Sequence, residues 1–127
     1  MIVNNPHAKE AEERWPSEYL ASNLKLKSMS KDEQEELFEL GRVNIKKVAE
    51  AYIDNKLASS DEVQRLIDIH YNWVSVFWKP NKDAYTGLGK LYVEDPRFTE
   101  NYDKYATGCA AFMAQAMQIY ADENLSN

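Results

Sequence analysis

The feature that most constrains this chain is a repeat of apolar side chains, at steps of three and four residues, between positions 30 and 78. Ser30-Lys31-Asp32-Glu33 precedes the first half of the repeat, and Ser59-Ser60-Asp61-Glu62 precedes the second. A serine followed three residues later by glutamate caps a helix, because the serine accepts an exposed backbone N–H and the glutamate reaches back to the cap. The pattern therefore predicts two long helices, each with one buried face.

Each predicted helix has its own apolar face. The first face contains Phe38, Gly41, Ile45, Val48 and Tyr52. The second, which is rich in aromatic rings, contains Val63, Leu66, Ile67, His70, Trp73, Val74, Phe77 and Trp78. Lys79-Pro80-Asn81 should end the second helix, since the residue before a proline is pushed away from helical angles.

The rest of the chain predicts shorter helices separated by proline and glycine. Three follow at about Lys82 to Val93, Thr99 to Lys104 and Ala106 to Asp122, and two precede at 8–15 and 17–27. The last helix should turn Cys109, Phe112, Met113, Ala116, Met117 and Tyr120 inward. With four Gly, four Pro and no strand-like alternation, the fold class is all-α, with five to seven helices and no sheet.

Size and charge exclude several classes of protein. The 127 residues are enough for one domain with one core. The formal net charge is −6 and the basic residues are dispersed, so we expect no direct binding to nucleic acid. Apolar stretches fall far short of the ~20 residues that cross a bilayer, and the sequence after Met1 does not resemble a signal peptide. We expect a cytoplasmic protein without a membrane partner.

No set of side chains predicts catalysis, a cofactor or a metal. His7 and His70 are far apart and Cys109 is the single cysteine, so zinc-ligand spacing is absent. We interpret His70 first as a packed residue with one hydrogen bond and second as a ligand-facing one. Cys109 is interpreted as a small buried hydrophobic residue. We therefore expect no enzyme, no catalytic residue, no cofactor and no metal.

Aromatic residues make up 12% of the chain and occur in every segment. Tyrosine and tryptophan pack in cores, and they also line apolar clefts where one edge of the ring meets a polar partner. For each Tyr or Trp between Trp73 and Tyr92, the two interpretations are equally favoured. A ligand-binding domain would place such rings in a concavity, whereas a helical protein–protein adaptor would place them on an exposed patch.

The run from Leu88 to Thr99 resembles the signature of the TipAS antibiotic-recognition domain of MerR-type transcription activators. The stretch from Ala106 to Met113 and the opening Glu13-Arg14-Trp15 are similar to further elements of that family. His70, Trp73, Ser75, Phe77 and Trp78 resemble the family's His-x-x-Trp-x-Ser-x-Phe-Trp helix. The resemblance extends over about residues 10–122.

This resemblance implies a globin-like set of helices around a cleft that binds thiopeptide-like or other bulky hydrophobic antibiotics. Residues 1–28 would be mobile lid segments that fold over the ligand, and residues 29–127 would form the helical domain. A MerR-type DNA-binding domain is the implied partner in a full-length protein, and a free short form would sequester drug. The family's capturing cysteine is replaced in the loop 79–82, which implies reversible binding. The expected ligand-binding residues are Trp15, Tyr19, His70, Trp73, Phe77, Trp78, Tyr85, Tyr92, Phe98 and Tyr102.

Overall fold

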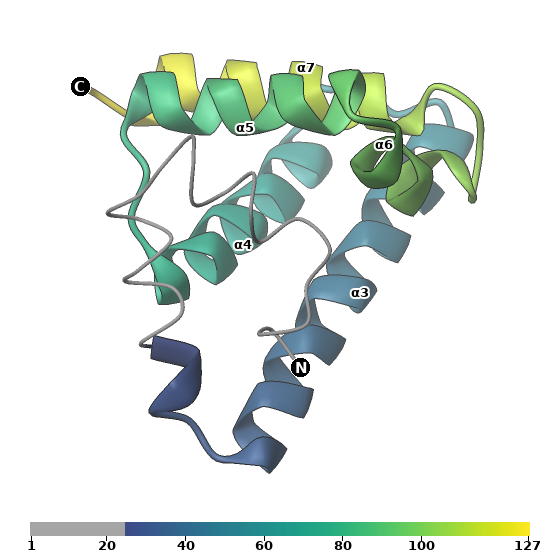
Figure 1. The fold of residues 1–127 in the computed structure, drawn as a ribbon. Coiled ribbons are helices and arrows are strands. Elements are labelled where there is room, and N and C mark those ends of the chain that lie inside the picture. Colours follow the sequence, from purple (N-terminus) through teal and green to yellow (C-terminus); the bar gives the residue numbers. More distant parts are fainter. Residues whose placement is uncertain (1–24) are drawn as a thin grey trace.

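The computed structural model describes residues 25–127, which form helices and connecting loops without a strand in that range. Residues 25–27 are helical, and the helices that follow are α3 (Lys31–Ile53), α4 (Asp61–Phe77), α5 (Lys82–Glu94), α6 (Pro96–Asp103) and α7 (Cys109–Asn124). α5 and α7 lie side by side as one layer, α3 and α4 pass beneath it, and α6 lies at one end (Figure 1). The predicted all-α class is confirmed. The predicted helix at 8–15 and nearly all of that at 17–27 lie outside the described residues.

Local capping explains where α3 and α4 begin. At α3 the Ser30 Oγ accepts from the Glu33 N–H at 3.1 Å, and the Ser30 N–H donates to Glu33 Oε1 at 2.9 Å. The predicted capping box is therefore confirmed there. At α4 the cap is Ser60, whose Oγ accepts from the Val63 N–H at 3.3 Å. The predicted box beginning at Ser59 is wrong, because the helix begins one residue later and Val63 has no side-chain acceptor to complete it.

α6 begins earlier than the predicted Thr99. Pro96 occupies its first turn, where a fixed φ and a missing N–H cost nothing. The Asp95 side chain caps this helix by accepting from the Arg97 N–H at 3.0 Å. The Thr99 hydroxyl then donates to the Tyr92 carbonyl at 2.6 Å, which ties α6 to the end of α5. The sequence Asp95-Pro96 thus starts a helix as well as ending one.

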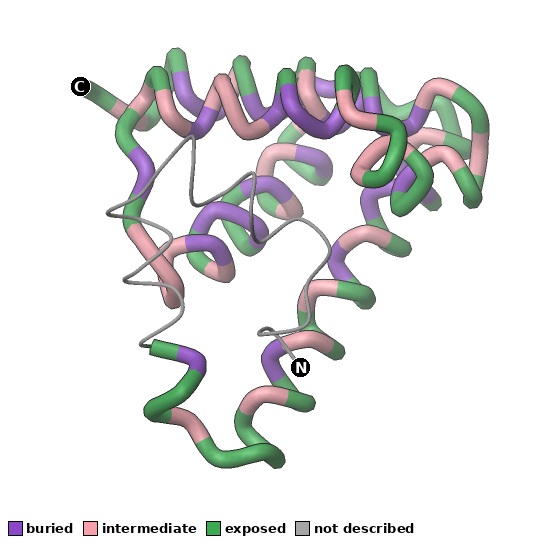
Figure 2. The backbone as a smooth tube through the Cα atoms, viewed as in Figure 1, coloured by how far each residue is buried: buried purple, intermediate pink, exposed green. Residues whose placement is uncertain are grey.

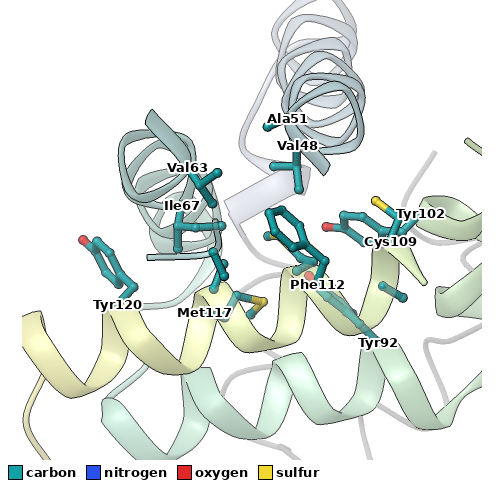
Figure 3. Packing of buried hydrophobic residues seen from close by; sticks show 14 of the residues in the cluster. Val48, Ala51, Val63, Ile67, Tyr92, Tyr102, Cys109, Phe112, Met117 and Tyr120 are labelled. Atoms are coloured by element: carbon teal, nitrogen blue, oxygen red, sulfur yellow. The ribbon is translucent and has the colours of Figure 1, made fainter. Parts of the chain in front are cut away.

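The core forms where α7 packs against α5 on one side and α3 and α4 on the other (Figures 2 and 3). The inward set predicted for α7 is confirmed, since all six residues are buried. Figure 3 shows Phe112 of α7 pointing towards Val48 of α3. The Met117 Sδ faces α5 instead, 3.5 Å from where a Cβ on Gly89 would lie. Gly89 lets α5 approach closely, because a Cβ there would lie 3.3 Å from the Ala114 Cα. No helix in residues 25–127 is long and apolar enough to span a membrane.

Candidate ligand-binding site

A cavity of about 410 Å³ lies among α3, α4, the end of α5, and α6 with the loop that follows it. α3 contributes Phe38, Gly41, Arg42, Asn44 and Ile45 to its wall. The other elements contribute His70, Trp73, Tyr92, Phe98, Asn101, Tyr102, Lys104 and Tyr105. Six of these side chains are aromatic rings other than histidine, so the wall is mainly apolar and rigid.

Trp73 is held against the backbone of α3. Its Nε1–H donates to the Leu37 carbonyl at 2.7 Å. A Cβ on Gly41 would lie 2.9 Å from the Trp73 Cζ2, so only glycine leaves space for the indole at this level of α3. Phe77 packs edge-on against the indole, with ring centroids 5.3 Å apart. The indole is therefore a fixed part of the cavity wall.

His70 links α4 to α5 through two tyrosine hydroxyls. Its Nδ1 lies 2.7 Å from the Tyr85 hydroxyl and its Nε2 lies 3.3 Å from the Tyr92 hydroxyl. Burial lowers the pKa of His70 to about 3, so the ring is neutral near pH 7. One ring nitrogen then donates and the other accepts, and each hydroxyl takes the complementary role. The interpretation of His70 as a packed, hydrogen-bonded residue is confirmed.

Three rings from α5 and α6 form a second rigid part of the wall. The Tyr92 ring lies 5.8 Å from Phe98 and 5.4 Å from Tyr102, centroid to centroid, and both pairs are tilted by 33°. Burial raises the pKa of Tyr92 and that of Tyr102, so both phenols keep their protons. The bond from Thr99 to the Tyr92 carbonyl fixes α6 relative to α5, and with it the three rings.

The charged groups in the wall are two cations, Arg42 and Lys104. Arg42 pairs with Glu39 at 2.7 Å on the exposed side of α3. The Lys104 Nζ lies 5.3 Å from the centre of the Tyr105 ring. The described residues place no carboxylate in the wall, although the whole chain carries a net charge of −6. The cavity thus differs in charge from the rest of the molecule.

The structure brings together part of the predicted ligand-binding set. His70, Trp73, Tyr92, Phe98 and Tyr102 all line the cavity.

The other predicted residues lie elsewhere. Phe77 packs behind Trp73, and Trp78 is half-buried at the C-cap of α4. Tyr85 is fully buried behind His70, where it supports the wall without lining it. Trp15 and Tyr19 lie outside the described residues. Ligand contact by any of the ten remains a prediction.

Eight residues of the wall were not predicted as site residues: Phe38, Gly41, Arg42, Asn44, Ile45, Asn101, Lys104 and Tyr105. Phe38, Gly41 and Ile45 carried a signal, because the periodicity of α3 placed them on its apolar face. Asn44 lies in that same helical phase, one turn before Val48, but its side chain is polar and was therefore not counted in the apolar face. The others lie on exposed positions, where sequence periodicity carries no information about a neighbouring helix.

Two further groups bear on the chemistry of the site. Cys109 is fully buried, and burial raises the pKa of its thiol to about 11, which agrees with its interpretation as a small hydrophobic residue. Among residues 25–127 there is no group of three His, Cys, Asp or Glu side chains that could hold a metal ion.

A helical fold with an aromatic-lined cavity is typical of helical domains that bind small molecules. Comparison with known proteins narrows this class. The sequence pattern of the TipAS antibiotic-recognition domain matches residues 7–120, and the chain belongs to this family. The resemblance seen in the sequence is therefore confirmed.

One solved structure and two groups of relatives support the assignment. The structure of TipAS in complex with nosiheptide, from a thiopeptide antibiotic multidrug resistance system of Streptomyces lividans, matches with a TM-score of 0.72 and 27% identity. The match covers 92% of this chain and 84% of that one.

The relatives are regulators of transcription. The HTH-type transcriptional regulator SkgA of Caulobacter vibrioides is 30% identical over 98 residues, which are 76% of this chain and 38% of SkgA. The HTH-type transcriptional activator mta of Bacillus subtilis is 45% identical over 40 residues, which are 32% of this chain and 16% of mta. The chain thus matches less than half the length of either relative.

Proposed function

We propose that this domain binds a thiopeptide-like or other bulky hydrophobic antibiotic in the cavity between α3, α4, α5 and α6. The observation that carries the proposal is the cavity of about 410 Å³ with six aromatic rings in its wall. Each such ring offers on the order of 150–250 Å² of contact area. The match to a domain solved with nosiheptide supports the same ligand class.

A macrocyclic ligand needs contacts from more than one side. Ordering a segment over a ligand costs conformational entropy, which wide rings on both sides of the ligand offset. We propose that Trp15 and Tyr19 contact the ligand from segment 1–28, as the family resemblance implies, and that Trp73 and Tyr92 contact it from the cavity. The proposed set is completed by the other six expected residues: His70, Phe77, Trp78, Tyr85, Phe98 and Tyr102. Tyr85 would act through its bond to His70.

The proposed binding is reversible and involves no catalytic step. A thiolate is the nucleophile in covalent capture, and the buried Cys109 keeps its proton at neutral pH. The loop 79–82 contains no cysteine. His70 is neutral and bonded to two tyrosine hydroxyls, and burial raises the pKa of both phenols, so they keep their protons at neutral pH. These contacts suit a binding wall and not an enzyme.

The proposed biological role is drug sensing. The relatives SkgA and mta are HTH-type regulators that extend well beyond the matched region. We propose that this domain acts in the cytoplasm, either joined to a MerR-type DNA-binding half or as a free short form that sequesters drug.

The alternative function, a protein–protein adaptor, has less support. An adaptor presents its large rings on an exposed patch. Among the described residues, Tyr105 is the one aromatic ring in the set of exposed large hydrophobic side chains, and it lines the cavity. The other exposed hydrophobic side chains are aliphatic.

A thermal-shift titration with nosiheptide and other hydrophobic antibiotics tests the proposal. Ligand at a hundred times its dissociation constant adds about 2.7 kcal/mol to stability, which raises the melting temperature by several degrees. We expect this rise to disappear in Trp73→Ala and to persist in Leu57→Ala, whose side chain is 71% exposed. The mass of the denatured protein should be unchanged after exposure. No shift with any antibiotic, or a covalent adduct, contradicts the proposal.

A further inference from the structure

Asn44 is an unusual member of the cavity wall, because it is a polar residue on the buried face of α3. Its exposed fraction is 4%, and it lines the cavity. Its Nδ2–H donates to the Leu66 carbonyl of α4 at 2.9 Å. Its Oδ1 is fully buried and has no hydrogen-bond partner. A buried acceptor without a donor destabilises a protein, so such a group in a native fold calls for an explanation.

The identity of the unpartnered atom follows from the bond to Leu66. Exchanging the oxygen and nitrogen of the amide would place Oδ1 against the Leu66 carbonyl, and two acceptors repel each other. The free atom is therefore an acceptor. The Leu66 carbonyl lies one helical turn before His70 in α4, so the amide is held at the level of the cavity.

Two neighbouring polar groups in the wall, His70 and the Trp73 N–H, are already engaged. His70, the other buried polar side chain of the described residues, bonds to two tyrosine hydroxyls. The Trp73 N–H bonds to the Leu37 carbonyl. Among the described residues of the wall, Asn44 is thus the one with a fully buried side-chain acceptor that lacks a partner.

We propose that Asn44 determines ligand specificity by accepting a hydrogen bond from a neutral, planar N–H group, such as an amide or a heteroaromatic N–H. The proposal requires that the Asn44 side chain, whose Oδ1 is fully buried, shifts when a ligand binds so that this atom reaches the adjacent cavity. The described residues place no carboxylate in the wall, and Lys104 adds a positive charge that disfavours a cationic donor. The aromatic rings favour a flat group, and an acceptor left unpaired rejects ligands that lack a donor. This inference rests on the proposed ligand-binding role of the cavity.

Indole and benzofuran test the inference, because they share one shape and differ in the N–H that indole donates. We expect indole to bind wild-type protein about three- to tenfold more tightly, the ratio that one neutral hydrogen bond provides. Asn44→Leu, of similar volume, should bring the ratio to about one. Asn72→Leu, the same change at an exposed position of α4 outside the wall, should leave the ratio unchanged. In NMR spectra of wild-type protein, the Asn44 side-chain amide signals should shift with indole and much less with benzofuran.

The ratio of indole affinity to benzofuran affinity distinguishes a role of Asn44 in ligand specificity from a role in the fold alone. A purely structural Asn44 would lower the affinity for both fragments equally, and that result overturns the inference. Equal binding of the two fragments to wild-type protein also overturns it, yet leaves the cavity as a ligand site. If neither fragment nor nosiheptide binds, the proposed function and this inference both fail. Should Asn44→Leu not fold, the wild-type ratio and the amide shifts decide the matter.

Discussion

At the scale of single residues, Gly41 and His70 shape the cavity without offering it a conventional binding group. Because Gly41 has no side chain, it leaves room for the Trp73 indole against α3. His70 acts through its neutral ring, which joins the Tyr85 and Tyr92 hydroxyls across two helices. A substitution at each position should therefore have its own measurable effect on binding or stability.

Gly41→Ala should damage the cavity more than the helix. The new Cβ would lie 2.9 Å from the Trp73 Cζ2, so the indole must move and its bond to the Leu37 carbonyl weakens. We expect nosiheptide affinity to fall by about tenfold and stability by about 1–3 kcal/mol, as overpacking does elsewhere. Gly87→Ala is the matched control, because nothing lies within 4 Å of its added Cβ. It should stabilise α5 by about 0.5–1 kcal/mol. Equal behaviour of the two variants in urea unfolding and titration would contradict this account.

His70 should make the protein less stable in acid. Burial lowers its pKa from 6.5 to about 3, so between these values the unfolded state binds a proton that the folded state does not. Stability therefore rises with pH across this window. From pH 5 to pH 7, His70 should contribute about 2 kcal/mol of this rise. Chemical unfolding at both pH values checks it: His70→Gln, which cannot titrate, should lose that part of the rise. An unchanged pH dependence in the variant argues against a neutral buried ring.

At the scale of elements, the starts of helices depend on single hydrogen bonds whose register is easily misjudged by one residue. Ser59 and Ser60 both satisfy the composition of an N-cap, yet Ser60 makes the bond to Val63. Likewise, Asp95-Pro96 ends α5 and opens α6 in one step. The positions of the wall residues on α4 and α6 depend on where these helices begin.

Ser60→Ala should therefore lower the free energy of unfolding by about 1 kcal/mol, because the first turn of α4 loses its cap. Ser59→Ala is the control one residue away, and its effect should stay within about 0.5 kcal/mol, as for ordinary surface changes. Urea denaturation of both variants provides the comparison. A larger loss from Ser59→Ala would place the cap at Ser59.

At the scale of the whole molecule, the paired α5 and α7 form a layer to which α3, α4 and α6 attach (Figure 1). The cavity lies among α3, α4, α6 and the end of α5. α7 carries much of the core and contributes nothing to the cavity wall. α7 therefore contributes to the core alone, whereas α3, α4, α5 and α6 contribute both to the core and to the cavity wall. Ligand binding should be more sensitive to changes in α3, α6 and segment 1–28 than to changes in α7.

Trp15→Ala tests the proposed lid segment. We expect the loss of this ring to weaken nosiheptide binding by about 1–3 kcal/mol, with a much smaller change in the stability of the empty protein. Calorimetric titration and urea unfolding measure the two effects. Hydrogen exchange of the empty protein should also show faster exchange at 8–26 than at 63–78. Equal losses of binding and stability would make Trp15 a core residue, and equally slow exchange would exclude a lid.

The sequence by itself determined the helical class, the approximate bounds of α3, α4, α5 and α7, and the buried face of α7. The face predicted for α3 is only partly correct, because Val48 is its one buried member and the other buried residues of α3 are Leu37, Asn44, Ala49 and Ala51. Periodicity, caps and prolines act within a few residues, so these features are readable along the chain. The family signature likewise depends on contiguous residues such as those from Leu88 to Thr99. These local signals also placed His70, Trp73 and Tyr92 among the site candidates.

Only the tertiary structure decided which residues of the buried helix faces line the cavity and which pack in the core. Helical phase tells which side of a helix is apolar, but not what lies across from it. Tyr85 and Tyr92 share one face of α5, yet Tyr85 packs behind His70 whereas Tyr92 reaches the wall. Asn44 became a candidate only when its bond to Leu66 and its unpartnered oxygen were seen together. Such contacts join positions far apart in the chain, and no local pattern encodes them.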